Sequence, residues 1–275
     1  MTRRRISAAV ARSVAFACAA AWLISTAGDA AAQTAQARIT RAIKDVKLVS
    51  TQGSARAVVA NDRPSDDSIL RTGVDSRAEI AFAGPSIARL GGKTAVRSRN
   101  QARELELREG AVLFQVPAGV YDAKITTGGI NVAPAGTTGI IERFGSSYVK
   151  ILVLEGTARV YVDTVGESVL VNPGQLLITK PGAKTLPEAV HFNIAQLVKT
   201  SLLTGRDFAP LASRARIDEQ IRKQQNDPNL TPTNLVIYGR GTLVTLVPPT
   251  PSPAASPKPR NASRASTRAT GSRSN

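Results

Sequence analysis

Two segments built to one plan constrain the fold of this chain more than any other feature of its sequence. Residues Tyr148–Val162 read YVKILVLEGTARVYV, and residues Leu105–Val116 read LELREGAVLFQV. In each, a Glu-Gly pair separates two stretches that are rich in Val, Ile, Leu and aromatic residues. Such residues favour strands, and glycine supplies the backbone freedom that is needed where a strand bends or turns. The sequence therefore predicts two short strands in each segment, meeting at the Glu-Gly pair.

Further short apolar stretches lie on both sides of these segments, with Gly, Pro, Asn and Asp residues between them that favour turns. The predicted strands are Val46–Ser50, Ser54–Ala60, Ile69–Thr72, Arg77–Phe82, Ile87–Leu90, Tyr121–Thr127, Ile130–Val132, Ile140–Arg143, Ser168–Val171 and Leu176–Thr179. Long helical periodicity is absent over roughly 140 residues, which disfavours a parallel sheet covered by helices. The pattern predicts an all-β domain, a compact sandwich or solenoid-like stack of short antiparallel strands.

The first 32 residues have the three parts of a secretory signal peptide. Met1–Arg12 is short and basic, Val14–Ile24 is apolar, and three alanines precede Gln33 as a small-residue cleavage signal. The apolar run is shorter than the about 20 residues of a transmembrane helix, although an uncleaved anchor stays open as an alternative. The pattern predicts a periplasmic or secreted protein. Cleavage would remove Cys18, the only cysteine, and leave no disulfide or thiol metal site.

The pattern changes after residue 186. Apolar residues at helical spacing predict helices within His191–Leu203 and Leu211–Gln225, and neither is long enough to be stable alone, so we expect the first to pack on the β domain. The region Leu235–Val247 reads as a hairpin, and residues 248–275 predict a disordered basic tail. The predicted organisation is a signal peptide (1–32), a linker or first edge strand (33–43), a β domain (44–186), a helical segment with a hairpin (187–247) and the tail.

A formal net charge of +16 is often found in proteins that bind nucleic acid, anionic lipid or acidic glycan. The favoured interpretation is that the basic residues are scattered for solubility and continue into a disordered basic tail. No compact block of Lys and Arg with interleaved aromatic residues occurs, so nucleic acid is not the expected partner. Within the β domain a loose basic cluster could present a positive face to an anionic glycan or an acidic partner. Its members are Arg89, Lys93, Arg97, Arg99 and Arg103. The favoured interpretation is that they are the solvated sides of strands and loops, because half-buried strands need polar residues on one face.

The sequence shows no catalytic or metal-binding constellation. His191 is the only histidine, and it lacks the second His or Cys of a metal site and the Gly-x-Ser-x-Gly elbow of a hydrolase. A polar role at a helix end or on the surface is expected for it. Glu109 and Glu155 could form a carboxylate pair for acid/base catalysis, but their equivalent positions in the two segments favour a structural role. We therefore expect a protein that is not an enzyme and has no cofactor.

The order and spacing of the glycine-containing motifs resemble the FecR domain family, named for the periplasmic regulator of ferric citrate uptake. The resemblance spans about Val46 to Thr179. The matching segments are Gly84–Leu90 with Thr94, Leu107–Val116, Ala135–Ile141, Val153–Val162 and Val171–Leu177.

Family members of the regulator type have a cytoplasmic anti-sigma region, a membrane helix and this domain in the periplasm, where they relay a signal from an outer-membrane receptor. Here only about a dozen residues precede the apolar segment, too few for a domain that could hold a sigma factor. The resemblance implies a periplasmic or secreted adaptor that binds a protein partner, such as an outer-membrane receptor. The alternative is an envelope structural module or one that binds glycan or the cell wall.

Overall fold

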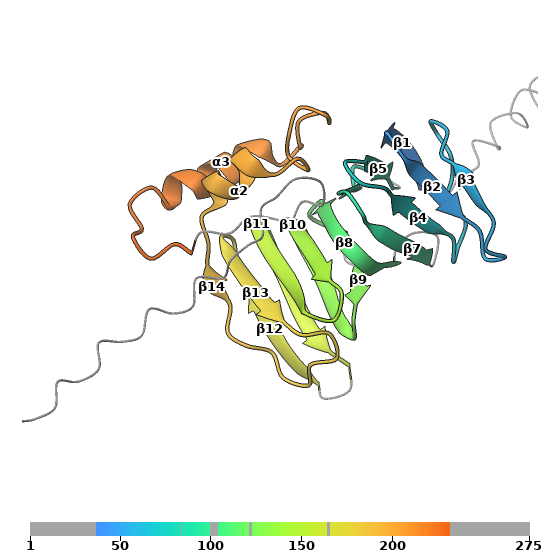
Figure 1. Cartoon of the computed structure of the whole chain (residues 1–275). Coiled ribbons are helices and arrows are strands. Elements are labelled where there is room, and N and C mark those ends of the chain that lie inside the picture. The colour runs from blue at the N-terminus through green and yellow to red at the C-terminus, as the bar shows by residue number, and fades with distance from the viewer. Residues whose placement is uncertain (1–36, 83, 100–103, 121–122, 164–165, 232–275) are drawn as a thin grey trace, which may run out of the picture. The chain divides into compact units, whose positions relative to one another are not determined.

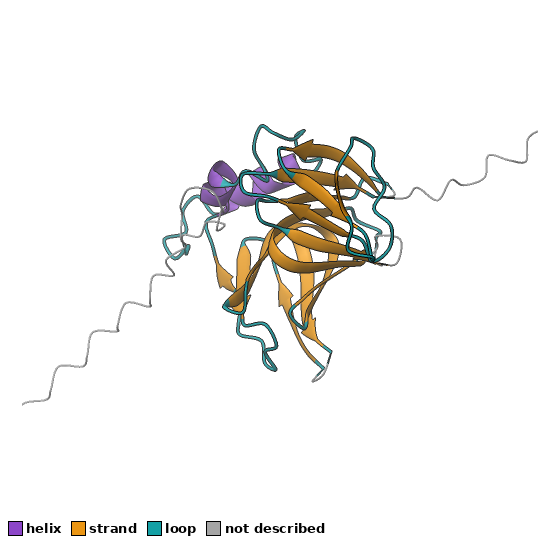
Figure 2. Ribbon diagram, turned by 45° about the vertical axis from the view of Figure 1, so that its right-hand side comes forward, coloured by secondary structure: helices purple, strands orange, loops and turns teal. Residues whose placement is uncertain are grey.

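The computed structural model describes residues 37–82, 84–99, 104–120, 123–163 and 166–231, and these residues form mostly strands with two helices (Figures 1 and 2). Residues 232–275, which include the segment Thr245–Asn275, lie outside the described residues. The predicted signal peptide, the hairpin in Leu235–Val247, the tail and Arg103 also lie outside them. The prediction of an all-β body followed by two helices is confirmed.

Fourteen strands are joined by hydrogen bonds in the described part of the chain. The first seven are β1 (Arg38–Ile43), β2 (Val46–Val49), β3 (Ala55–Ala57), β4 (Ile69–Thr72), β5 (Arg77–Ala81), β6 (Ile87–Leu90) and β7 (Ala95–Arg99). The others are β8 (Glu104–Val116), β9 (Lys124–Thr127), β10 (Ile130–Phe144), β11 (Tyr148–Val162), β12 (Glu167–Val171), β13 (Gln175–Thr179) and β14 (Val190–His191).

The strand pairing divides into two sets that share the long strands β8, β10 and β11. Sheet I has the order β14, β13, first half of β11, second half of β10, second half of β8, β6, β5, β1. Sheet II has the order β12, second half of β11, first half of β10, β9, first half of β8, β7, β4, β2, β3. Each long strand therefore passes from one sheet to the other.

The prediction of two short strands at each Glu-Gly pair is wrong, because β8 and β11 continue through it. Gly110 and Gly156 have φ values of 89° and 74°, and the pairing register shifts nearby, so each glycine lies at a bulge that bends the strand without ending it. An added Cβ on Gly156 would clash with the carbonyl oxygen of Gly136 on β10. Only glycine fits this crossing of the two strands.

The same mechanism explains a second error. Residues 133–139 are predicted as a loop between two strands, yet β10 runs unbroken from Ile130 to Phe144 and has its own register shift between Ala135 and Thr138. Strand β7 was not predicted, and β9 pairs with β8 in parallel, against the expectation of a wholly antiparallel stack. At the N-terminal side, β1 pairs with β5, which selects the edge-strand alternative over a linker for residues 38–43.

One apolar core joins the two sheets, as period-two alternation requires. It takes inward side chains from sheet I, such as Ile80, Phe114 and Ile151, and from sheet II, such as Leu70 and Val160. A second apolar cluster lies on the opposite, outer face of sheet I, where the helical segment packs.

The two helices are α2 (Ile194–Thr200) and α3 (Arg214–Lys223). The side chain of Asn193 caps α2 by accepting a hydrogen bond from the backbone N–H of Gln196, at 2.9 Å. Ile194, Leu197 and Ile217 are buried in the second cluster, which confirms that α2 packs on the β body. Within the described ranges no helix is long and apolar enough to cross a membrane.

Candidate functional site

The outer face of sheet I is covered by residues 192–224, which we call the cap. The sheet contributes Ala111, Leu113, Ile140, Leu152, Leu154 and Leu176 to the contact. The cap contributes Phe192, Ile194, Leu197, Leu203, Leu211 and Ile217. Burying six such cap side chains stabilises the docked state by on the order of 10 kcal/mol, before the entropy cost of ordering the segment is subtracted.

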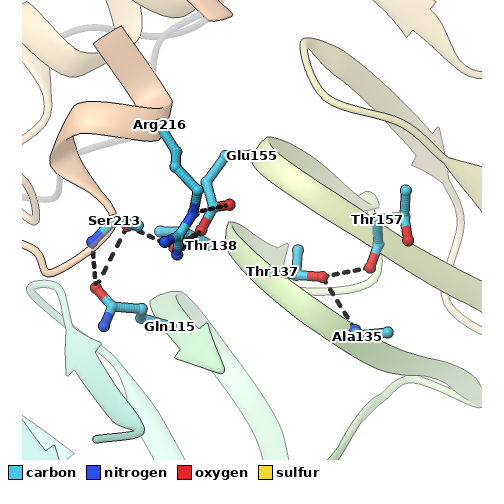
Figure 3. A network of polar contacts seen from close by, with 8 residues as sticks. All are labelled: Gln115, Ala135, Thr137, Thr138, Glu155, Thr157, Ser213 and Arg216. Atoms are coloured by element: carbon cyan, nitrogen blue, oxygen red, sulfur yellow. Dashed lines mark hydrogen bonds and ion pairs between the residues drawn. The ribbon is translucent and has the colours of Figure 1, made fainter. Parts of the chain in front are cut away.

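Around this apolar contact, polar side chains of the sheet bond groups of the cap at three places. The first is the network at the start of α3 (Figure 3). The Glu155 carboxylate, on β11, accepts hydrogen bonds from the Arg216 guanidinium at 2.9 and 3.2 Å. It also accepts one from the Thr138 hydroxyl at 2.7 Å. The Thr138 and Ser213 hydroxyls are 2.7 Å apart, and Ser213 in turn lies 3.3 Å from the side-chain oxygen of Gln115.

The burial of the Glu155 carboxylate makes this network important for docking of the cap on sheet I. The Glu155 side chain is 4% exposed while that of Arg216 is 58% exposed, so the pair lies at the boundary between the buried contact and water. The hydrogen bond and charge of Glu155 raise the pKa of Arg216. Removing the arginine would leave a buried carboxylate with the Thr138 hydroxyl as its remaining side-chain donor in the network, which is costly.

The second place is Arg89 on β6, whose side chain is 1% exposed. Its Nε donates to the Glu79 carboxylate at 2.8 Å, while Nη1 and Nη2 donate to the backbone carbonyls of Leu203 and Ala209 at 3.0 and 2.6 Å. The guanidinium also lies 4.7 Å from the ring centre of Phe208. Burial lowers the pKa of Arg89, and the bond to Glu79 opposes that shift. Arg89 therefore fixes the segment between α2 and α3 onto the sheet.

The third place is an ion pair between Arg77 on β5 and Asp207 of the cap, with 2.7 Å between the charged atoms. The Arg77 side chain is 12% exposed. Three cap–sheet contacts thus use charged side chains of β5, β6 and β11, in addition to the apolar cluster. These contacts hold the cap on sheet I.

A cavity of about 250 Å³ lies within the cap. It is lined by Val198, Thr204, Gly205, Arg206, Phe208, Pro210, Leu211, Arg214 and Ile217. These residues come from α2, the segment between the helices, and α3, so the cavity exists only when the cap is folded.

The basic cluster predicted from the sequence is not one exposed face. Arg89 is buried, and its prediction as a surface contact residue is wrong because the cap covers it. Arg97 and Arg99, on β7, both pair with Asp67 and Glu106, at 3.4 to 4.0 Å. Lys93 is exposed at the turn between β6 and β7, with a φ of 49°.

The other candidate residues also have structural positions. Both carboxylate oxygens of Glu109 accept the backbone N–H of Gly145, at 3.2 and 3.1 Å, as the structural interpretation of this residue predicts. His191 is exposed in β14 just before α2. In the described part of the chain no group of three His, Cys, Asp or Glu side chains is placed to hold a metal ion.

Sequence reasoning missed Gln115, Thr138, Ser213 and Arg216 altogether. The sequence does contain one signal of a contact on the outer face of sheet I. Polar side chains interrupt the apolar runs of β8 and β10 at positions that face away from the central core, namely Gln115, Thr138 and Glu142. Polar residues at such positions indicate a second contact layer, although they do not indicate which segment forms it.

Comparison with known proteins supports the family resemblance. Residues 68–159 match the model of the family described as FecR protein. No curated protein matches the chain.

Two crystal structures of a candidate anti-sigma factor from Parabacteroides distasonis ATCC 8503 are similar at a low level. The 2.50 Å structure is 12% identical, with a TM-score of 0.37, over 45% of this chain and 59% of that chain. The 1.65 Å structure is 15% identical, with a TM-score of 0.41, over 57% of this chain and 75% of that chain. The matched residues 68–159 include the sheet residues that contact the cap, namely Arg77, Arg89, Gln115, Thr138 and Glu155.

Proposed function

We propose that this protein is a non-enzymatic regulatory or sensory adaptor that binds a protein partner in the cell envelope. The observation that carries the proposal is the FecR match over residues 68–159. The regulatory role of FecR proteins supports an adaptor. The binding of a protein partner in the envelope is the step that we add.

The use of the polar residues supports binding over catalysis. Arg89 and Glu155, the charged residues that β6 and β11 direct at the cap, are engaged by Glu79, by cap carbonyls and by Arg216. The buried Glu142 and Lys150 pair with each other at 2.9 Å. These groups serve the fold, and catalysis would require acids or bases that are held in place and open to a substrate.

The signal-like pattern of residues 1–32 supports a periplasmic or secreted location. A glycan-binding role has less support than it has from the sequence alone, because Arg89 is buried and the charges of Arg97 and Arg99 are offset by Asp67 and Glu106.

Photo-crosslinking in the source organism tests the proposal. A photoreactive amino acid replaces exposed Leu170 on β12 or Val190 on β14, each 48% exposed, in the full-length chain. Buried Ile151 is the matched control position, because its side chain is fully covered. We expect one protein to be crosslinked from at least one exposed position, to be absent from the control, and to recover this chain in the reciprocal purification.

The same cells report the location. Fractionation is expected to place the chain in the envelope or the medium. Its intact mass is expected to match a chain whose first residue is Gln33. A chain that stays in the cytoplasm with residues 1–32 attached would contradict the envelope role. Retention on purified peptidoglycan at physiological salt, with no protein adduct from either position, would overturn the proposed protein partner in favour of a wall-binding module.

A further inference from the structure

The cap cavity combines an apolar floor with a basic rim. Phe208, Leu211 and Ile217 are 7%, 6% and 1% exposed, and with Val198 they form the apolar lining. Arg206 and Arg214 line the same cavity from the segment between the helices and from α3.

The rim carries a net positive charge. Arg206 is exposed and has no carboxylate partner among the residues that the structure describes, while the charge of Arg214 is shared with Asp218, at 2.9 and 3.1 Å. No acidic side chain lines the cavity within the described ranges. An occupant with negative charge beside an apolar group would complement this arrangement.

We propose that the cavity receives one large apolar side chain, of the Leu or Phe type, from an acidic segment of the protein partner. The proposal rests on the proposed function as a protein-binding adaptor, and it names the surface and the chemistry of the partner. A single apolar anchor in a pocket, with charged neighbours at its rim, is a common arrangement of the residues that dominate binding energy.

Size and charge argue for this occupant over others. At about 250 Å³ the cavity is smaller than the roughly 300–1,000 Å³ of most small-molecule sites. The protein's own residues 248–275 contain Lys258 and four arginines and no acidic residue, so the rim would repel them. An acidic segment of another protein meets both requirements.

A titration with short peptides tests the proposal on the mature chain with labelled methyl groups. The probes are five-residue peptides with a central Phe between two acidic residues on each side, and matched peptides with a central Ala or with Lys in place of the acids. Saturable shifts of the methyl signals of Val198, Leu211 and Ile217 report occupancy. Sodium decanoate serves as a probe for a lipid-like occupant.

We expect the acidic Phe peptide to shift these signals and the Ala peptide to leave them in place. The Lys peptide and Arg206→Glu are each expected to weaken binding about fivefold or more, and Arg222→Glu to change it by less than about twofold. Arg222 is the matched control because it is an exposed arginine of α3 outside the cavity lining.

Three results would overturn the proposal: no saturable shift with any peptide, equal binding of the Lys peptide, or tighter binding of decanoate than of the acidic Phe peptide. Its failure is separable from failure of the proposed function. Leu170 and Val190 lie outside the cavity lining, so a specific crosslinked partner with an unresponsive cavity would refute the cavity alone.

Discussion

The guanidinium of Arg89 serves four groups at once, namely the Glu79 carboxylate, two cap carbonyls and the Phe208 ring. A planar fork of five donors suits this task, and the point charge of a lysine does not. The cost of burying the charge is offset only while every partner is present. The sequence places Arg89 in a basic cluster that is either solvated or open to an anionic partner, whereas the structure shows a buried side chain that joins the sheet to the cap.

Replacing Arg89 by Met removes the buried cation and leaves the Glu79 carboxylate, which is 15% exposed, with the hydrogen bond from the Thr40 hydroxyl and without its charged partner. We expect the free energy of unfolding to fall by about 3–5 kcal/mol, measured by urea denaturation. Arg97→Met, on a partly exposed arginine of β7, is the control, with an expected change within about 1 kcal/mol.

A second variant separates the lost pair from a general failure of packing. Arg89→Met combined with Glu79→Gln removes both charges, and it is expected to recover part of the loss, because no unpaired charge is left buried. Equal destabilisation by the single and double variants would contradict the assigned role of the ion pair.

Asp62, in the loop that follows β3 at the edge of sheet II, provides a pH-dependent contact. Hydrogen bonds from Arg56 at 2.6 Å and from the backbone N–H of Val59 at 2.8 Å lower the pKa of Asp62. Because its pKa is lower in the folded state, its stabilising effect is complete above the ordinary carboxyl pKa of about 4, and is lost as the pH falls through the lowered value.

Asp62→Asn should therefore destabilise the protein at pH 6 and have a smaller effect near pH 2. Urea denaturation of both proteins at several pH values measures this difference. A stability difference that does not vary with pH would refute the assigned contact of Asp62 with Arg56.

At the scale of elements, the bends in β8, β10 and β11 decide the topology, since each bend passes a strand from sheet I to sheet II. Gly156 and Gly182 offer a matched pair of substitutions, because both have a φ of 74°. A Cβ on Gly156 would meet the Gly136 carbonyl, whereas one on Gly182 would meet nothing within 4 Å.

Gly182→Ala is expected to cost about 1 kcal/mol from backbone strain alone. Gly156→Ala adds the clash at the strand crossing, and we expect it to cost at least about 2 kcal/mol more, measured by thermal or urea unfolding. Equal effects of the two substitutions would show that the crossing of β10 and β11 is looser than described.

The elements that alternation and turn residues specify locally could be predicted: β4 and β6 have the predicted bounds, and both helices fall within their predicted segments. Continuous strands through Gly110, Gly136 and Gly156 could not be predicted, because a glycine at a bulge and a glycine at a turn look alike in sequence. The contacts of Arg89 could not be predicted either, since Leu203 and Ala209 lie more than a hundred residues away.

At the scale of the molecule, the described residues form sheet II, sheet I and the cap, stacked in that order. Sheet I has one apolar cluster on each of its two faces. The central cluster lies between sheets I and II, and the outer cluster joins sheet I to the cap. The FecR match over residues 68–159 includes strands of both sheets and none of the cap, so the cap adds a cover and a cavity to the matched segment. The proposed binding cavity depends on that docked cap.

An engineered disulfide tests cap docking most directly. The hydroxyl oxygens of Thr138 and Ser213 are 2.7 Å apart, across the contact between β10 and the residue before α3. Thr138→Cys and Ser213→Cys are combined in a Cys18→Ser background, and mild oxidation is followed by intact mass and by counting free thiols. The account predicts that nearly every chain forms an internal disulfide, seen as the loss of two hydrogens in the mass and of both free thiols. It predicts no disulfide when Thr138→Cys is combined with Arg222→Cys in place of Ser213→Cys. Two free, reactive thiols at positions 138 and 213, or equal bonding in the control, would contradict it.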